Sequence, residues 1–210
     1  MPAVAGIAPA VSLNENTTIG TVELKDGVTG LKATVLADRL WADIDKVAVV
    51  AGDATITRPA DTTAYADKDL VANSTSAGSV VAPSFTAART VAGGGYVVGA
   101  RIQKSTNVVT NAAFRLHLFS VVPTFTSAGD NSALATVVVA LAKGYLGYVD
   151  VTAMVGFSDV AWGVGAIDNS RGKLPFIAVA QTLYGVLEAK AAYTPGDSEV
   201  FTLALLVAQK

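Results

Sequence analysis

The expected fold is decided by residues 99–131, which read GARIQKSTNVVTNAAFRLHLFSVVPTFTSAGDN. The second half of this stretch alternates between two sets of side chains, Phe114, Leu116 and Leu118 on one side and Arg115, His117 and Phe119 on the other. Strict alternation is typical of a strand with one buried face. Pro123 cannot donate a ladder hydrogen bond, so we expect the strand to end there. The stretch therefore predicts a half-buried strand at the middle of the chain.

A second strand is expected just upstream, over Val97–Ser105. The polar connector Thr106–Asn111 separates it from the first strand, and this spacing predicts that the two pair as a hairpin. Beyond Pro123, residues Gly129, Asp130 and Asn131 are turn formers. We expect this hairpin and its exit loop to form the centre of an all-β domain.

Short strands separated by turn signals continue along the rest of the chain. We expect a β-segment around Phe85, and strands over Ala135–Ala142, Tyr145–Val155, Lys173–Gln181, Thr182–Lys190 and Ser198–Ala208. About eight strands at this spacing are typical of a double-sheet jelly roll. Immunoglobulin-like packing is the alternative.

The first quarter of the chain has a different pattern. Residues 1–18 are rich in Ala, Pro and Val without a clear period, which predicts an extended arm. Thr21–Val35 reads as a hairpin around Asp26-Gly27, Ala37–Lys46 as a short helix, and Lys46–Ala51 as a strand closed by Gly52-Asp53. We therefore expect an arm with a small hairpin-containing region over residues 1–57 and a β-sandwich over residues 58–210.

The composition indicates a protein that covers part of its surface by assembly. Hydrophobic residues make up 51% of the chain and charged residues only 15%, with a mean hydropathy of +0.47. Ordinary globular domains carry about 25% charged residues. Permanent interfaces are more apolar than free surface, so we expect a stable oligomer.

Charge and cysteine content argue against several classes of function. The net charge is −2 without a basic cluster, which argues against binding of nucleic acid through its phosphates. The chain has no cysteine, so it has neither disulfides nor thiolate sites. No uninterrupted apolar run reaches about 18 residues, and the first residues lack a positive segment, so we expect neither a membrane span nor a secretory signal.

Catalytic and cofactor motifs are absent from the sequence. His117 is the only histidine and lies in the middle of a strand, so we interpret it as a structural or interface residue. Two Asp-Asn pairs in expected loops, Asp130-Asn131 and Asp168-Asn169, could offer oxygen ligands to calcium, but turn formation is their commoner role. Asp43 and Asp45 would point to different faces of a helix. We expect no catalytic residue, cofactor or metal.

One group of aromatic residues has two possible interpretations. Tyr145, Tyr148, Phe157 and Trp162 could line a sugar-binding face. Aromatic residues in β-sandwiches more often anchor a core or an interface, and this is the reading we favour.

Four stretches carry a resemblance to a known family. They are RPADTTAYADKDLVANS (58–74), RLHLFSVVPTFTSAGDN (115–131), YLGYVDV (145–151) and YTPGDSEVFTLALLVAQ (193–209). Together they make the region from about 58 to 209 resemble the jelly-roll head decoration, or cement, proteins of tailed bacteriophages. Residues 1–57 do not share this likeness.

The resemblance implies a function and a set of partners. It implies a homotrimer that binds major capsid protein subunits on the outer surface of a virion, made in the host cytoplasm, and that stabilises the shell. It transfers no functional residues. The alternative is a carbohydrate- or receptor-binding β-module of a phage fibre or tail.

The N-terminal arm is the expected attachment segment. Its prolines and small residues cannot build a core, and an extended segment is ordered when it docks on a partner. Val4, Ile7, Val11 and Leu13 are the expected partner-binding anchors. The competing expectation is that the arm packs across its own domain or a sister subunit.

Overall fold

The computed structural model describes residues 22–25, 32–35, 49–126, 129–134, 144–167 and 172–209. It divides the chain into two compact units, Met1–Asp45 and Lys46–Lys210. In the first unit, β1 (Val22–Lys25) and β2 (Lys32–Val35) pair antiparallel, with Val22 opposite Val35. This pairing confirms the hairpin expected over Thr21–Val35. The expected arm, the helix over Ala37–Lys46 and the strand over Ala135–Ala142 lie outside the described residues.

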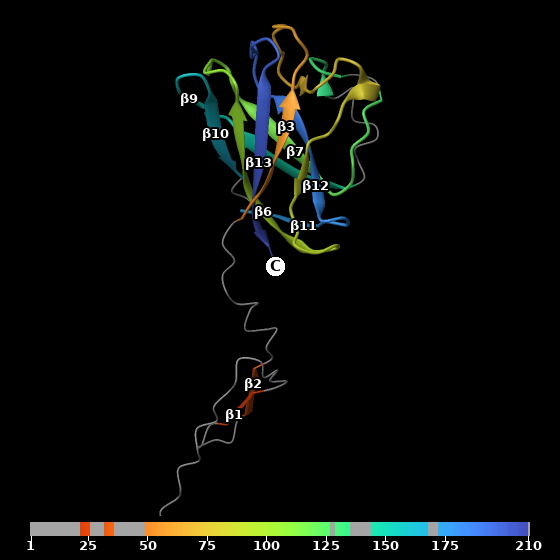
Figure 1. Ribbon diagram of the computed structural model, residues 1–210, viewed down its shortest axis with the longest axis vertical. Helices are drawn as coiled ribbons and strands as arrows, with labels where there is room; N and C mark the ends of the chain where they lie inside the picture. Colours follow the sequence, from red (N-terminus) through yellow and green to blue (C-terminus); the bar gives the residue numbers. More distant parts are fainter. Residues whose placement is uncertain are drawn as a thin grey trace, which may run out of the picture. The chain divides into compact units, whose positions relative to one another are not determined.

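The second unit is a β-sandwich of two antiparallel sheets (Figure 1). The first, called the β6 sheet, has the order β3 (Val49–Thr57), β13 (Val200–Gln209), β6 (Gly94–Lys104), β10 (Ala161–Ala166) and β9 (Val155–Gly156), and β11 (Leu174–Ile177) pairs with the start of β6. The second, called the β7 sheet, has the order β4 (Leu70–Val71), β12 (Thr182–Ala189), β7 (Phe114–Phe119) and β8 (Tyr145–Val151), and β5 (Ser84–Thr86) pairs with β12. A single 3₁₀ turn, η1 (Ala77–Ser79), precedes β5 among the described residues.

The order of the strands is that of a jelly roll. The chain passes from β3 to β4 and β5 in the other sheet, returns to β6, and crosses again to β7 and β8. After β10 it crosses to β12 and returns to β13, which lies between β3 and β6. This repeated crossing between two packed sheets, one of six strands and one of five, is typical of a jelly roll. The expected all-β jelly-roll sandwich is confirmed, in place of immunoglobulin-like packing.

The hairpin expected between β6 and β7 is wrong. The two strands lie in opposite sheets, where β6 pairs with β13 and β10, and β7 pairs with β12 and β8. The polar connector between them spans the end of the sandwich. A polar loop of this length can close a hairpin or cross between layers, and the local sequence does not distinguish the two.

Several boundaries also differ from the sequence-based expectation. Strand β7 ends at Phe119, four residues before Pro123. Strand β3 runs through Gly52-Asp53 to Thr57 and pairs with β13, so the sandwich begins before residue 58. Strand β10 was not expected, because its sequence AWGVGA contains two glycines.

The core lies between the sheets. Phe114, Leu116 and Leu118 are fully buried on the inner face of β7, as their alternation predicts. Each large apolar side chain contributes roughly 1.5–3 kcal/mol when it is fully buried. Phe119 points to the opposite face and is buried too, because it belongs to a second, smaller cluster with Phe125, Leu134 and Val186.

Candidate functional surfaces

A buried ion network ties the loop after β3 to the connection between β7 and β8. The Arg58 Nη2 atom donates to Asp130 Oδ2 at 2.9 Å, and both side chains are completely buried. Tyr65 donates its hydroxyl proton to Asp130 Oδ1 at 2.7 Å and accepts a hydrogen bond from Arg58 Nε. The backbone N–H of Ala72 also donates to Asp130. Asp130 therefore holds three positions of the chain that lie 58 to 72 residues before it.

A second network lies at the ends of β6 and β13. The Lys104 ammonium is 3.2 Å from Glu199 Oε1, and both side chains are completely buried. Thr106 and Tyr193 complete the shell around Glu199, with the Tyr193 hydroxyl 2.7 Å from Oε2. Burial and the hydrogen bond to Glu199 raise the pKa of Tyr193, so its phenol stays a proton donor to the carboxylate.

The rings of Tyr65 and Tyr193 connect the two networks. They stack with centroids 6.5 Å apart, and the Tyr65 N–H donates to the Tyr193 carbonyl at 2.9 Å. A continuous chain of contacts therefore runs from Asp130 to Lys104 through the end of the sandwich. Three of the four stretches that carry the family resemblance supply residues to it, namely Arg58 and Tyr65, Asp130, and Tyr193 and Glu199.

This arrangement decides the role of Asp130. The oxygens of its carboxylate accept hydrogen bonds from Arg58, Tyr65 and Ala72, so they act in structure rather than as open ligands. The described residues contain no group of three or more His, Cys, Asp or Glu side chains that could hold a metal ion. The other acidic candidates, Asp43, Asp45 and Asp168-Asn169, lie outside the described residues.

The outer face of the β7 sheet carries paired charges. The Arg115 guanidinium donates two hydrogen bonds to Asp150, at 2.6 and 2.8 Å, and lies 3.8 Å from the centroid of the Tyr148 ring. The pairing follows from the register, which places Arg115 opposite Asp150 on β8. The hydrogen bonds to Asp150 raise the pKa of Arg115, so the guanidinium stays ionised.

His117 lies at the centre of the same face. Its Nε2 atom is 2.6 Å from Glu188 Oε2 on β12, and its Nδ1 atom is 3.1 Å from the Tyr145 hydroxyl on β8. Both ring nitrogens therefore have partners on the flanking strands. This geometry links three strands, as the interpretation of His117 as a structural or interface residue requires.

The neighbours of Glu188 change the pKa of its carboxyl group. Burial acts to raise its pKa, but the hydrogen bond and charge of His117, with Lys190 and Arg115, lower the pKa below its ordinary value. The Lys190 ammonium is 3.7 Å from Glu188 Oε1. The carboxylate is thus held in its ionised form by His117 and Arg115 on β7 and by Lys190 just after β12.

Strand β10 has an unusual distribution of side-chain size. Its inward positions hold Gly163 and Gly165, where a Cβ atom would collide with the backbone carbonyls of Ala153 and Asp150. The end of β8 and the residues that follow it approach so closely that larger residues cannot fit. The bulky residues of β10, Trp162 and Val164, consequently occupy the solvent-facing positions.

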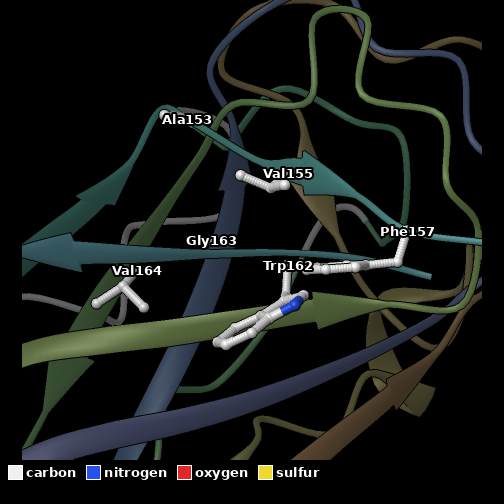
Figure 2. A pocket seen from close by; sticks show the side chains of 6 residues that line it. All are labelled: Ala153, Val155, Phe157, Trp162, Gly163 and Val164. Carbon is white, nitrogen blue, oxygen red and sulfur yellow. The ribbon is translucent and has the colours of Figure 1, made fainter.

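These outward residues form an apolar groove with the neighbouring edge strand β9. Figure 2 shows Trp162 and Phe157 side by side, with Val155 across from them and Val164 further along β10. The two rings stack at 6.0 Å, and the four side chains are 41–60% exposed. The groove has a volume of about 220 Å³ and is lined by Ala153, Val155, Phe157, Trp162, Gly163 and Val164.

The groove can accept an apolar side chain. A cavity of about 150 Å³ is sufficient for benzene, so the groove has room for one aromatic or branched aliphatic group. Its lining holds no ionisable side chain and no side-chain amide or hydroxyl. Contiguous exposed apolar groups of this kind mark interaction sites.

The structure separates the aromatic group proposed from the sequence. Phe157 and Trp162 lie on the outer face of the β6 sheet, whereas Tyr145 and Tyr148 belong to β8 and contact His117 on the β7 sheet. They do not form one sugar-binding face. The signal that could have located the groove is the alternation of small and bulky residues in AWGVGA, which marks a strand with its large side chains on one face.

Comparison with models of protein families finds no match for this chain, and a search of curated proteins finds none. Among the described residues, no helix is long and apolar enough to cross a membrane. The predicted anchors Val4, Ile7, Val11 and Leu13 lie outside the described residues.

Proposed function

We propose that this chain is a virion structural protein that decorates and stabilises a bacteriophage capsid by binding major capsid protein subunits as a homotrimer. The observation that carries the proposal is the exposed apolar groove of β9 and β10 on a rigid jelly roll. A large exposed apolar surface is costly in water and is covered in a functional assembly. The resemblance described above supplies the identity of that assembly.

The distribution of charge supports a structural role. The charged side chains on the outer face of the β7 sheet are paired with one another, and two further pairs are buried inside the sandwich. These pairs fix the positions of strands and loops. A fixed structure suits a protein that stabilises a capsid shell against internal pressure.

The test is quantitative protein analysis and electron microscopy of particles purified from cells infected with the phage that encodes the chain. We expect the protein in many regular copies on the outer surface of the capsid. Its absence from purified particles, or its presence in only a few copies at the tail, would contradict the proposal.

The arm is proposed to carry attachment to the capsid. In this proposal Val4, Ile7, Val11 and Leu13 become buried against capsid subunits, which offsets an ordering cost of about 1–2 kcal/mol per residue. Deletion of residues 1–18 should leave folding and oligomer size unchanged and weaken binding to empty capsids. Loss of the oligomer would assign the arm to self-assembly, and undiminished capsid binding would exclude the attachment role.

The stacked pair of Phe157 and Trp162 favours a second candidate, a carbohydrate-binding module. Exposed aromatic faces can stack on sugar rings, and Gln103 lies opposite Trp162 in the register. Hydroxyl-rich ligands need several convergent polar groups, however, and the groove lining is apolar. Glycan-array binding that is lost in Trp162→Ala would favour this candidate over the first.

A further inference from the structure

A second apolar surface lies at the other end of the β6 sheet. We call it the tip, and it consists of Val91, Ile177 and Val179, which are 65–70% exposed. The two valines lie in turns, where polar side chains are the usual choice. The tip therefore exposes apolar groups where solubility alone would favour polar ones.

The tip is held rigid by hydrogen bonds between its two turns. The Ala178 N–H donates to the Gly93 carbonyl at 2.9 Å, and the Gln181 side chain donates to the Arg89 carbonyl at 2.7 Å. A preorganised protrusion loses little conformational entropy when it binds. The tip is thus suited to insertion into a complementary groove.

The groove and the tip cannot meet within one chain. Ile177 is opposite Gly94 at the start of β6, whereas Trp162 is opposite Gln103 near its end. Nine residues of strand separate these positions, which corresponds to roughly 30 Å. Figure 1 shows β11 and β9 toward opposite ends of the sandwich.

Among the described residues, the unpaired charges beside the two surfaces are complementary, because Arg101, opposite Val164 of the groove, is paired with Asp53. Asp159, in the turn between β9 and β10, is exposed two residues after Phe157. Arg89 and Lys173 are exposed beside the tip. Opposite charges on two surfaces favour their approach and disfavour contact of either surface with its own copy.

We infer that the groove of one copy binds the tip of the next, so that the chain assembles head to tail. This inference deepens the proposed function and rests on the self-association that it includes. A groove and a protrusion at opposite ends of one molecule form a heterologous contact, and such contacts close into rings when the rotation permits. The contact is heterologous, so it does not produce a two-fold dimer, and the homotrimer of the proposed function corresponds to its closed form.

The contact between the groove and the tip is small. It involves seven exposed apolar side chains, four in the groove and three in the tip. A stable interface needs about 1,000 Å² in total, so polar rim residues must contribute the remainder. In a ring each copy makes two such contacts, which compensates for the modest size of each one.

The test uses three substitutions of exposed valines by aspartate. Val164→Asp disables the groove, Val179→Asp disables the tip, and Val81→Asp is the matched control at a valine that is 69% exposed on the β5 side of the molecule. Each of the first two should weaken self-association at least about 100-fold, because an unpaired charge would be buried. The control should assemble like the unmodified chain.

Mixing the two disabled chains gives the decisive result. One chain keeps an intact tip and the other an intact groove, so a head-to-tail contact predicts a 1:1 complex that grows no further. Analytical ultracentrifugation at micromolar concentration measures this. Failure of the mixture to form a 1:1 complex, full assembly of Val179→Asp alone, or a monomeric unmodified chain would overturn the inference.

A covalent test covers the case in which an aspartate variant does not fold. The chain has no cysteine, so single cysteines can be introduced without a background reaction. Val155→Cys and Ile177→Cys chains should form a cross-link when mixed and oxidised, and neither should do so alone. Cross-linking within Val155→Cys alone would overturn the head-to-tail contact.

The outcome is independent of the capsid proposal. Oligomer size is measured on the free protein, whereas decoration is measured on particles. A head-to-tail ring that is absent from particles would leave this inference standing and contradict the proposed function. Capsids decorated by an oligomer that survives both aspartate substitutions would contradict this inference and leave the proposed function standing.

Discussion

The interior of the sandwich and the groove on its surface reverse the usual placement of residues. Arg58, Asp130, Lys104 and Glu199 have side chains that are completely buried, although only 15% of the chain is charged. The groove instead leaves Phe157 and Trp162 half exposed. Charged residues are mostly found outside and large apolar residues inside.

This difference shows that the two regions satisfy different requirements. The buried pairs fix the loops that join the sheets. A buried charge without its partners costs free energy, so only the loop arrangement that supplies all of them is stable. The groove side chains are about half exposed, so they contribute little to the fold of one chain, and in the proposed assembly a second copy covers them. The comparison predicts that substitutions in the interior change the free energy of unfolding strongly and that substitutions at the groove change it little.

The largest effect is expected from Asp130→Ala. The substitution leaves the buried Arg58 guanidinium with only the distant, partly exposed carboxylate of Asp61, so the free energy of unfolding should fall by about 3–5 kcal/mol. Urea denaturation of both proteins measures the difference. Asp61→Ala is the matched control, since Asp61 also contacts Arg58, at 3.5 Å, but is partly exposed. Equal losses in the two variants would contradict the role assigned to the buried pair.

A smaller effect, dependent on pH, is expected at the half-buried cluster of the β7 sheet. The pKa of Glu188 is lowered in the folded state, so its contribution is complete above its ordinary pKa of 4.5 and is lost as the pH falls through the folded value. His117→Gln removes part of that lowering and should cost about 1 kcal/mol at neutral pH. It should also reduce the loss of stability in acid.

Urea denaturation at a series of pH values between 3 and 7 checks this expectation. If the free energy of unfolding of the variant falls as steeply with decreasing pH as that of the unmodified chain, His117 does not lower the pKa of Glu188. A hydrolytic or lyase activity that disappears in His117→Gln would overturn the structural interpretation of this residue.

Trp162→Ala should change the folding of the single chain by about 1 kcal/mol or less, because its side chain faces solvent. The measurement is made in the Val179→Asp background, so that self-association does not contribute to the apparent stability. Leu116→Ala, on the inner face of β7, should cost about 2–5 kcal/mol in the same background. Similar losses at the two positions would remove the distinction between groove and core.

The smallest effect is expected for the exposed pair beside the groove. Arg101 Nη2 is 3.3 Å from Asp53 Oδ1, and both side chains are at least one third exposed. A double-mutant cycle with alanine should give a coupling energy of about 0.5 kcal/mol or less. A coupling of several kcal/mol would show that outer pairs act like the buried ones.

Local pattern predicted part of this molecule well. The alternation around Leu116 identified β7 and its buried face, and the turn signal at Asp26-Gly27 identified the hairpin of β1 and β2. Both features follow from residues that are neighbours in the chain. Local pattern did not predict strand β10, because its glycines are required by the close approach of a segment that is distant in sequence.

The candidate site was less predictable than the fold. Phe157 and Trp162 were recognised as aromatic residues that could contact a ligand, but they were grouped with Tyr145 and Tyr148, which belong to the other sheet. Sheet membership depends on the pairing of strands far apart in sequence. Asp130 was read as a turn former, and only its approach to Arg58, 72 positions away, makes it part of a buried pair.

The sequence by itself determined the all-β class, the shortage of charge and the absence of cysteine, since composition and two-residue periodicity are local properties. Tertiary structure decided which strands share a sheet, which charges are buried together and which apolar residues remain outside. The physical reason is that a β-strand presents two faces and two edges, and only its partners determine which of them meets water.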